Sequence, residues 1–268
     1  MPDFKFLSRA FLQINSMVFH FSFQNKNFEV DLNRGIDLSM PLKGDPSNPT
    51  AWYCPPPRFE PVMTEHFTGD VKLGGAVNFR DIYFNPHGHG THTECVGHIA
   101  FETYSLRDCM KEFNMMALLC TVSPEHFENG DRIIKVNHLE KYLSALYGIK
   151  TLIIRTLPND NSKLSRQYSN TNPPYFEAEA IQKIVDSGIE HLLVDLPSVD
   201  REEDAGALIG HHIFWNYPEN PRTNCSITEL IYVPDYVEDG IYFLQLGIAA
   251  FENDAAPSRP LIYPIVEI

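Results

Sequence analysis

The sequence of 268 residues contains no apolar run long enough to cross a membrane as a helix. Such a helix needs about eighteen to twenty consecutive apolar residues, so we expect no transmembrane segment. The N-terminus, Met1 to Phe23, is rich in aromatic residues but is interrupted by charged and amide side chains. It lacks the apolar centre and the small-residue cleavage site of a signal peptide. Met17 could be the true start, which would make residues 1–16 an extension before one domain over residues 17–268.

Paired cysteines and basic charge are scarce as well. The five cysteines are odd in number, widely spaced and without a C-x-x-C pair: Cys54, Cys95, Cys109, Cys120 and Cys225. This usage favours reduced thiols in a cytoplasmic protein and argues against a zinc ribbon. The 21 lysines and arginines are outnumbered by 35 aspartates and glutamates, which gives a net charge of −14. A phosphate-rich partner would be repelled, so we expect neither nucleic acid nor a membrane surface as a partner.

The chain also lacks internal repeats and low-complexity tracts, and its 43% hydrophobic residues can bury one large core. Apolar or alternating runs predict strands at 18–23, 28–32, 35–41, 150–155, 191–195, 229–233 and 241–249. Helical spacing predicts helices at 137–147 and 176–187, each ended by a glycine, and the prolines of residues 46–61 predict a loop. The strand–helix–strand order from 150 to 195 indicates a parallel crossover. We therefore expect a mixed α/β fold in a single domain.

One segment is unusually dense in groups that bind metals. Residues 87–98 hold four of the chain's 11 histidines together with Glu94. Imidazole and carboxylate ligands suit zinc, manganese or ferrous iron, and glycines let the backbone approach an ion closely. The plain alternatives are surface histidines in a glycine-rich loop, or a core histidine bonded to the backbone. We interpret the whole cluster as part of a metal centre.

The spacing within this segment divides its histidines into two groups. In an extended chain, His92, Glu94 and His98 would share one face, because side chains two residues apart point the same way. His87 and His89 have the opposite parity. A bulge at one of the neighbouring glycines would be needed to turn either of them toward an ion.

These residues resemble a known family. Gly90-Thr91-His92-x-Glu94-x-x-x-His98 is similar to the His-x-Gly-Thr-His-x-Asp-x-Pro-x-His motif of the cyclase family, which includes bacterial kynurenine formamidases and isatin hydrolases. Further similar segments follow the family's order: Asp-Leu-Ser-Met-Pro-Leu at 37–42, Ile-Arg-Thr at 154–156, Asp-Leu-Pro-Ser-Val-Asp at 195–200, and His211-His212 followed by Glu229. Several ordered motifs are more specific than one. The resemblance implies a swivelling β/β/α-like α/β fold, a single domain of mixed β-sheet with flanking helices.

The resemblance also implies a set of site residues. The metal ligands would be His92, Glu94, His211 and Glu229, with His98 transferring a proton. The family's first histidine falls on Gly88 here, so its role passes to His87 or His89. We favour His87, with a bulge at Gly88-His89.

Other positions depart from the family pattern or leave alternatives open. Glu94 replaces the usual aspartate and Val96 the usual proline, and either His211 or His212 could bind the metal. Trp52, Tyr53, Phe79 and Tyr83 could line a pocket for an aromatic substrate. Residues 159–174 could form a loop that closes over the site. Asp195 and Asp200 follow a buried strand and are as suited to capping a turn or holding a helix, and Cys95 has little support as a nucleophile.

The resemblance implies a metal-dependent hydrolase that uses zinc or manganese, with one or two ions per chain. The leading substrate is a small N-formyl aryl amide, as for arylformamidases. The alternatives are an isatin-type enzyme that opens a lactam or ester ring, and a non-catalytic relative that binds a metal or ligand. A homodimer or homotetramer is implied as well.

Overall fold

The computed structural model describes residues 17–268, and the possible extension over residues 1–16 lies outside them. The first strands are β1 (Val18–Phe23), β2 (Lys26–Asp31), β3 (Ile36–Asp37), β4 (Arg58–Pro61), β5 (Met63–Thr64), β6 (Phe67–Thr68), β7 (Arg80–Tyr83) and β8 (His92–Glu94). They are followed by β9 (Asn114–Val122), β10 (Glu125–His126), β11 (Arg132–Ile134), β12 (Thr151–Thr156), β13 (Tyr175–Phe176), β14 (His191–Val194), β15 (Ser226–Glu229), β16 (Gly240–Ile248) and β17 (Ala255–Glu267). The α-helices are α2 (Leu106–Cys109), α3 (Val136–Leu143), α4 (Ala178–Asp186) and α5 (Ile209–Trp215), with 3-10 turns at Leu32–Arg34, Val71–Leu73, Val96–His98 and Asn161–Ser165.

The main sheet closes into a ring through the short strand β8. Strands β9, β12, β14 and β15 run parallel, and β16 and β17 join them in antiparallel order. Strand β8 pairs antiparallel with both β15 and β17, which completes the order β17-β16-β9-β12-β14-β15-β8. The histidine-rich motif is therefore part of the ring and is held from both sides.

Alternate residues of the central strands face two different cores. On β9, Leu118 and Cys120 belong to the cluster that includes Ile181 of α4, whereas Ala117 and Leu119 belong to a second cluster formed mainly by strand residues. This alternation follows from the two-residue period of a strand. Strand β12 is buried along its whole length, as is typical of a parallel strand covered on both faces. The mixed α/β single-domain fold expected from the sequence is confirmed.

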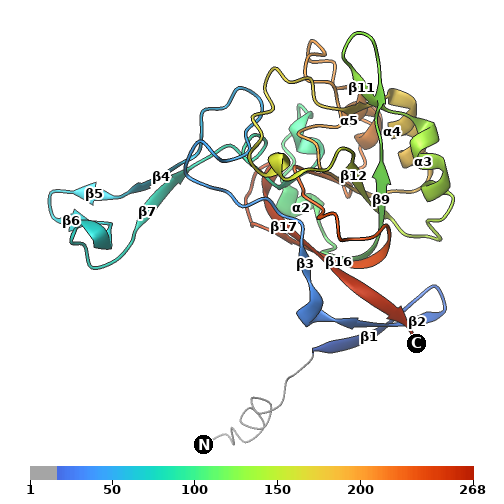
Figure 1. Ribbon diagram of the computed structural model, residues 1–268, viewed down its shortest axis with the longest axis horizontal. Coiled ribbons are helices and arrows are strands. Elements are labelled where there is room, and N and C mark those ends of the chain that lie inside the picture. The colour runs from blue at the N-terminus through green and yellow to red at the C-terminus, as the bar shows by residue number, and fades with distance from the viewer. Residues whose placement is uncertain (1–16) are drawn as a thin grey trace, which may run out of the picture.

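Helices α3, α4 and α5 lie together on one side of the ring (Figure 1), whereas Leu106 and Cys109 of α2 pack in the second cluster. In α4, Ala180, Ile181 and Ile184 are buried, which is the spacing of an amphipathic helix. Gly188 follows it with a φ of +81°, a left-handed conformation that glycine adopts without strain. Among residues 17–268, no helix is both long enough and apolar enough to span a membrane.

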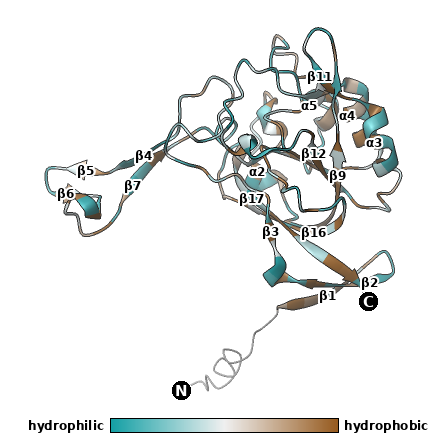
Figure 2. Cartoon of the chain, in the orientation of Figure 1, coloured by the Kyte–Doolittle hydropathy of each residue, from teal (hydrophilic) through white to brown (hydrophobic). Residues whose placement is uncertain are grey.

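A hairpin projects far from the ring. Strands β4 and β7 pair antiparallel, and β5 and β6 continue the hairpin outward (Figure 1). We call residues 58–83 the arm. Hydrophobic and hydrophilic residues both occur along it (Figure 2). Its exposed large apolar side chains are Met63, Phe67, Val71, Leu73, Val77, Phe79, Ile82 and Tyr83.

The sequence expectations differ from the structure at the ends of strands and in two long strands, β9 and β17, that were not expected. The strand expected at 229–233 lies at Ser226–Glu229, and Leu230 then leaves the strand with a φ of +54°. Of the strand expected at 35–41, only Ile36–Asp37 forms. Strand β17 was not expected, because its three prolines weaken the sequence signal of a strand.

Candidate metal centre

Strand pairing brings two acidic residues to the motif strand. In the β8–β15 register, Glu229 lies opposite His92. In the β8–β17 register, Ala255 lies opposite Glu94, so Asp254 precedes β17 directly beside the motif. The ring thus brings to the motif two acidic residues that lie more than a hundred residues from it in the sequence.

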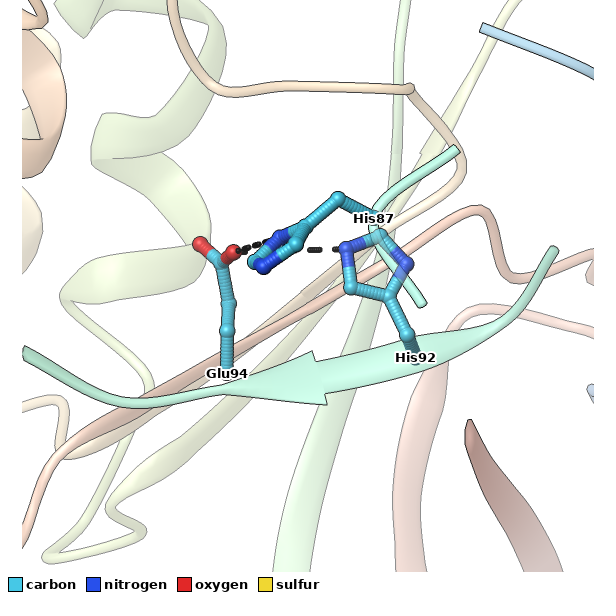
Figure 3. Close-up of side chains that lie close together, drawn as sticks. All are labelled: His87, His92 and Glu94. Atoms are coloured by element: carbon cyan, nitrogen blue, oxygen red, sulfur yellow. Dashed lines mark ion pairs between the residues drawn. The ribbon is translucent and has the colours of Figure 1, made fainter. Parts of the chain in front are cut away.

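His92 and Glu94 extend from the same face of β8, and His87 reaches toward Glu94 (Figure 3). His87 Nδ1 lies 2.9 Å from Glu94 Oε2, and His92 Nε2 lies 4.0 Å from the same oxygen. His92 Nε2 is also 3.5 Å from Glu229 Oε2. The side chains of His92, Glu94 and Glu229 are almost fully buried.

The structure brings His87 into this cluster and leaves His89 out. His87 N donates to Asn85 Oδ1 at 2.9 Å, which starts a tight turn. His89 instead lies with Nε2 2.8 Å from Pro55 O, and its Nδ1 accepts the Asn85 N–H at 2.8 Å. His89 is therefore a core histidine bonded to the backbone, the plain alternative considered for the whole segment.

Two glycines make this turn possible. The bend is a turn at residues 86–88 rather than a bulge in a strand. At Gly88 an added Cβ would approach Cys54 Sγ to 2.8 Å, which leaves no room for a side chain. Gly90 has a φ of +142°, a region that side chains other than glycine rarely occupy, and it leads the chain into β8.

His98 reaches the cluster from the 3-10 turn Val96–His98, so the expected extended face was wrong for this residue. Its Nε2 nevertheless lies 3.9 Å from Glu94 Oε2. The His98 ring stacks on His87 with 4.2 Å between ring centroids. Its side chain is 28% exposed, whereas His92 is fully buried, so His98 borders the adjoining pocket.

Helix α5 supplies the last histidine. His211 Nε2 lies 3.1 Å from Glu94 Oε1 and 3.9 Å from Glu229 Oε1. His212 points elsewhere, with Nδ1 3.0 Å from Tyr217 O. Of these two neighbouring histidines, only His211 lies in the cluster.

Two buried atoms in the cluster point to a cation. His92 Nε2 has no hydrogen-bond partner among residues 17–268, and Glu94 Oε2 faces three imidazole nitrogens, the nearest being His87 Nδ1 at 2.9 Å. Leaving a buried polar atom unpaired costs about 1–3 kcal/mol, and a divalent ion between imidazole and carboxylate groups would satisfy both. Potential ligand atoms of His87, His92 and Glu94 lie within 4.8 Å of one another, as do those of Glu94, His98 and His211. The donor set therefore fits zinc or manganese.

The neighbouring acids control the charge of the histidines. Burial disfavours the charged form of His87, but its hydrogen bonds with Asp254 and Glu94 outweigh burial and raise its pKa to about 10. Burial opposes charge on His211 as well, while Asp200 and Glu94 raise its pKa well above the ordinary value. Burial and the repulsion of Glu94 raise the pKa of Glu229. In the absence of metal, protons thus provide positive charge that an ion would otherwise supply.

Two histidines of the cluster are oriented by contacts at Nδ1, the ring nitrogen that points away from the cluster. His92 Nδ1 lies 2.9 Å from Gly90 O, and His211 Nδ1 lies 2.6 Å from Asp200 Oδ2. Such partners fix the orientation and tautomer of a ligand histidine. Asp200 had been expected to cap a turn or hold a helix, and it does accept Gly210 N at the start of α5. The structure adds its contact with His211.

Asp254 was missed by the sequence analysis. Its Oδ2 lies 2.8 Å from His87 Nε2 and 3.5 Å from His98 Nδ1. One carboxylate therefore contacts both histidines. Within the sequence, an aspartate before a proline-containing segment gave no signal of this role, because only the β8–β17 pairing brings it to the motif.

A cavity of about 490 Å³ adjoins the cluster. Its wall includes Trp52, Cys54, His87, His98, Arg201 and His211. Of the four aromatic residues expected to line a pocket, only Trp52 does so. Phe79 and Tyr83 lie on the arm and are 58% and 46% exposed, and the Tyr53 hydroxyl donates outward to Glu203 at 2.9 Å. The interpretation of those three as pocket residues was wrong.

Cys95 is not placed for catalysis. It is fully buried beside Cys109. A hydrogen bond with Cys109 and burial raise the pKa of the Cys95 thiol, which suppresses the reactive thiolate.

Asp195 holds the neighbouring segment, one of the two roles expected for it. Its Oδ2 accepts Lys163 Nζ at 2.7 Å and Thr156 N at 2.8 Å. Residues 159–174, expected as a loop over the metal site, contain the 3-10 turn Asn161–Ser165 and line a separate cavity described below.

Comparison with known proteins agrees with this arrangement. The chain is 24% identical over 238 residues to a kynurenine formamidase of Bacillus anthracis, covering 87% of this chain and 99% of that protein. It is 26% identical over 234 residues to the kynurenine formamidase of Bacillus thuringiensis strain Al Hakam, covering 86% of this chain and 97% of that protein. The structure of isatin hydrolase A from Labrenzia aggregata superposes with a TM-score of 0.62 at 17% identity, covering 86% and 93% of the two chains. The family model for cyclases matches residues 36–201, more than half of the sequence, and the chain therefore belongs to the cyclase family.

Proposed function

We propose that the protein is a metal-dependent hydrolase that cleaves an amide C–N bond in a small, aromatic substrate. The observation that carries the proposal is the buried, unpartnered His92 Nε2 beside Glu94 Oε2, in a cluster of histidines and carboxylates. The relatives named kynurenine formamidase support an arylformamide substrate, since they match almost over their whole length.

In this proposal the metal ligands are His87, His92, Glu94, His211 and Glu229. The cofactor is zinc or manganese, with one or two ions per chain. When bound, it supplies a Lewis acid that polarises the substrate carbonyl and acidifies water. The carboxylates of Glu94 and Glu229 each lie within 4.0 Å of both His92 and His211, which supports a shared ion or a pair of ions.

The remaining residues of the cluster handle the proton and the substrate. His98 borders the cavity and donates a proton to the departing nitrogen. Asp254 holds His98 and His87 in position, and Asp200 does the same for His211. Trp52 offers an aromatic surface in the cavity wall.

Metal content and turnover together test the proposal. The protein is purified without chelator, and its zinc and manganese are measured by inductively coupled plasma analysis. Absence of stoichiometric metal would refute the hydrolase. With metal present, hydrolysis is measured for N-formylkynurenine, isatin and simple lactones. Selective cleavage of the formamide supports the proposal, ring opening of isatin favours the lactam alternative, and no turnover across the set favours a non-catalytic relative.

We also propose a homo-oligomer, a dimer or tetramer, with the arm as a contact region. Contiguous exposed apolar side chains mark interaction surfaces, and the arm carries several, including Leu73, Phe79 and Ile82. Light scattering after size-exclusion chromatography tests this: replacing Phe79 and Ile82 by serine should lower the mass. A monomeric wild-type protein would contradict it. The free thiols at all five cysteines support a cytoplasmic location, with neither nucleic acid nor membrane as a partner.

A further inference from the structure

A second cavity lies at the carboxyl ends of two parallel strands. It measures about 350 Å³ and includes Thr156 at the end of β12 and Asp195 directly after β14. The carboxyl ends of parallel strands are a common place for ligands in α/β folds. This cavity shares no wall residue with the cavity at the metal centre. It is a separate site, called here the arginine cavity.

The charges around the arginine cavity are strongly positive for so acidic a protein. Arg132, Lys163 and Arg166 line it, with Asp195 as the single acidic wall residue. Lys163 is buried and paired with Asp195 at 2.7 Å, and its ammonium also contacts Thr156 O and Asn159 Oδ1. Lys163 and Asp195 therefore neutralise each other. The two arginines have no other acidic residue in the wall, although Asp160, which is not a wall residue, pairs with Arg166. The wall is thus positive in a chain of net charge −14.

Only one of the two guanidinium groups pairs with a carboxylate of the described residues. Arg132 is half-buried, yet it forms no ion pair with any residue of the 17–268 segment; its Nη2 donates to Asn172 O at 2.8 Å. Arg166 pairs with Asp160 at 3.6 Å, and its Nη2 also donates to Ser162 Oγ. Burial and the positive charge of Arg166 lower the pKa of Arg132, as expected for like charges near one another. Bringing two cations together is costly unless an anion joins them.

The rest of the wall indicates the kind of anion. Leu157, Pro158, Pro173, Pro174 and Leu196 form an apolar surface beside the arginines. Tyr168 also lines the cavity, and its buried hydroxyl has no partner among the described residues. The volume equals roughly twelve water molecules at ~30 Å³ each, far more than a bare oxyanion needs. Guanidinium groups bind carboxylates with paired, planar hydrogen bonds.

We propose that the arginine cavity binds a small organic carboxylate, with Arg132 and Arg166 holding the carboxylate group and the proline-lined wall covering its apolar part. The site is independent of hydrolysis at the metal centre. Its existence therefore stands or falls separately from the proposed function.

Isothermal titration calorimetry of the metal-loaded protein tests the proposal with sodium phenylacetate as the probe. The double variant Arg132→Gln/Arg166→Gln should bind phenylacetate at least about tenfold more weakly, the loss expected when about 1.4 kcal/mol of charge-assisted bonding is removed. Arg80→Gln, on the arm and paired with Asp70 at 3.5 Å, is the matched control and should bind as the wild type does. Metal content and thermal unfolding verify that each variant folds. Arg132→Lys, which keeps the charge without the planar fork, should give an intermediate loss.

Three results would overturn the proposal. Unchanged phenylacetate binding in the double variant would locate the probe elsewhere, such as the metal centre. Equal binding of the neutral 2-phenylacetamide would show that the charge is not recognised. Equal or tighter binding of inorganic phosphate at the same ionic strength would show that the apolar wall contributes nothing. Selective, arginine-dependent binding of phenylacetate supports it.

Discussion

The metal centre and the arginine cavity are built on the same ring of strands but carry opposite charge patterns. At the metal centre, buried acids and histidines converge, and His92 Nε2 has no hydrogen-bond partner in the described part of the chain. At the arginine cavity, two guanidinium groups share a wall with a single acid that is already paired. Polar groups that the protein leaves without partners therefore indicate the charge of the ligand that each site would bind. The first site calls for a cation and the second for an anion.

The two sites also differ in how they are supported. Residues of the metal centre come from two strands, a 3-10 turn, a helix and two loops, and β8 is held on both sides by pairing. The arginine cavity is formed largely by residues 156–174, supported by the buried Lys163–Asp195 pair. The predictions below test this contrast, from the largest expected effect to the smallest.

Removing a metal ligand should abolish the first site. His92→Ala should lower metal affinity by more than about 100-fold, since loss of outer partners alone costs 10–100-fold. Metal content after dialysis measures the effect. His89→Ala is the matched control: His89 is also buried, but it bonds to Pro55 O and lies outside the cluster. Full metal content and full activity in His92→Ala would refute the ligand assignment.

Removing the support behind a ligand should weaken the site without destroying it. Asp200→Asn should reduce metal affinity about 10–100-fold, because His211 loses the carboxylate 2.6 Å from its Nδ1. Competition with a chromogenic chelator measures the change. Asp204→Asn is a control from the same loop, since Asp204 bonds to backbone N–H groups rather than to a histidine. Equal losses in both variants would contradict a specific role for Asp200.

Metal affinity should rise with pH. The pKa of His87 is raised to about 10 and that of His211 well above its usual value, so both carry protons near neutral pH in the metal-free protein. A metal ion must displace those protons. For each proton released, metal affinity should therefore fall about tenfold for every unit by which the pH is lowered. Calorimetry in two buffers of different ionisation enthalpy counts the released protons. Pure pH independence between pH 6 and 8 would contradict the assignment.

The shared carboxylate should matter for proton transfer as well as for the metal. Asp254→Asn should lower kcat/KM about tenfold, within the range that positioned acids and bases contribute, and should shift its pH profile. In the unsubstituted protein, Asp254 Oδ2 contacts both His87 and His98. Glu252→Gln is the control, because Glu252 pairs with exposed Arg107. A loss of activity in Asp254→Asn without any change in the pH profile would indicate a structural role only.

The smallest expected effect is a null one that separates the two sites. The double variant Arg132→Gln/Arg166→Gln should change metal affinity less than about twofold, since the cavities share no wall residue and distant substitutions act independently. The same chelator competition measures it. A large loss would show that the two sites are coupled, through Arg132, Asn172 and Asp131 for example.

Much of this site could be predicted from the sequence because its groups are concentrated in twelve residues. His92 and Glu94 share a face by strand periodicity alone. His98 was placed in the cluster for the wrong reason, since a 3-10 turn and not an extended chain brings it there. The aromatic residues Phe79 and Tyr83 were misread because nothing in their spacing distinguishes an exposed arm from a pocket wall.

The sequence by itself determined the family, the α/β class and the chemistry of the motif, because local spacing and residue type carry those signals. Only the tertiary structure decided between His87 and His89 and between His211 and His212, since the choice depends on which backbone groups the other histidine meets. It alone brought Asp254 to the motif, through the β8–β17 pairing. It also brought Arg132 and Arg166 to one cavity. These contacts join distant segments, and strand pairing and packing set them rather than local pattern.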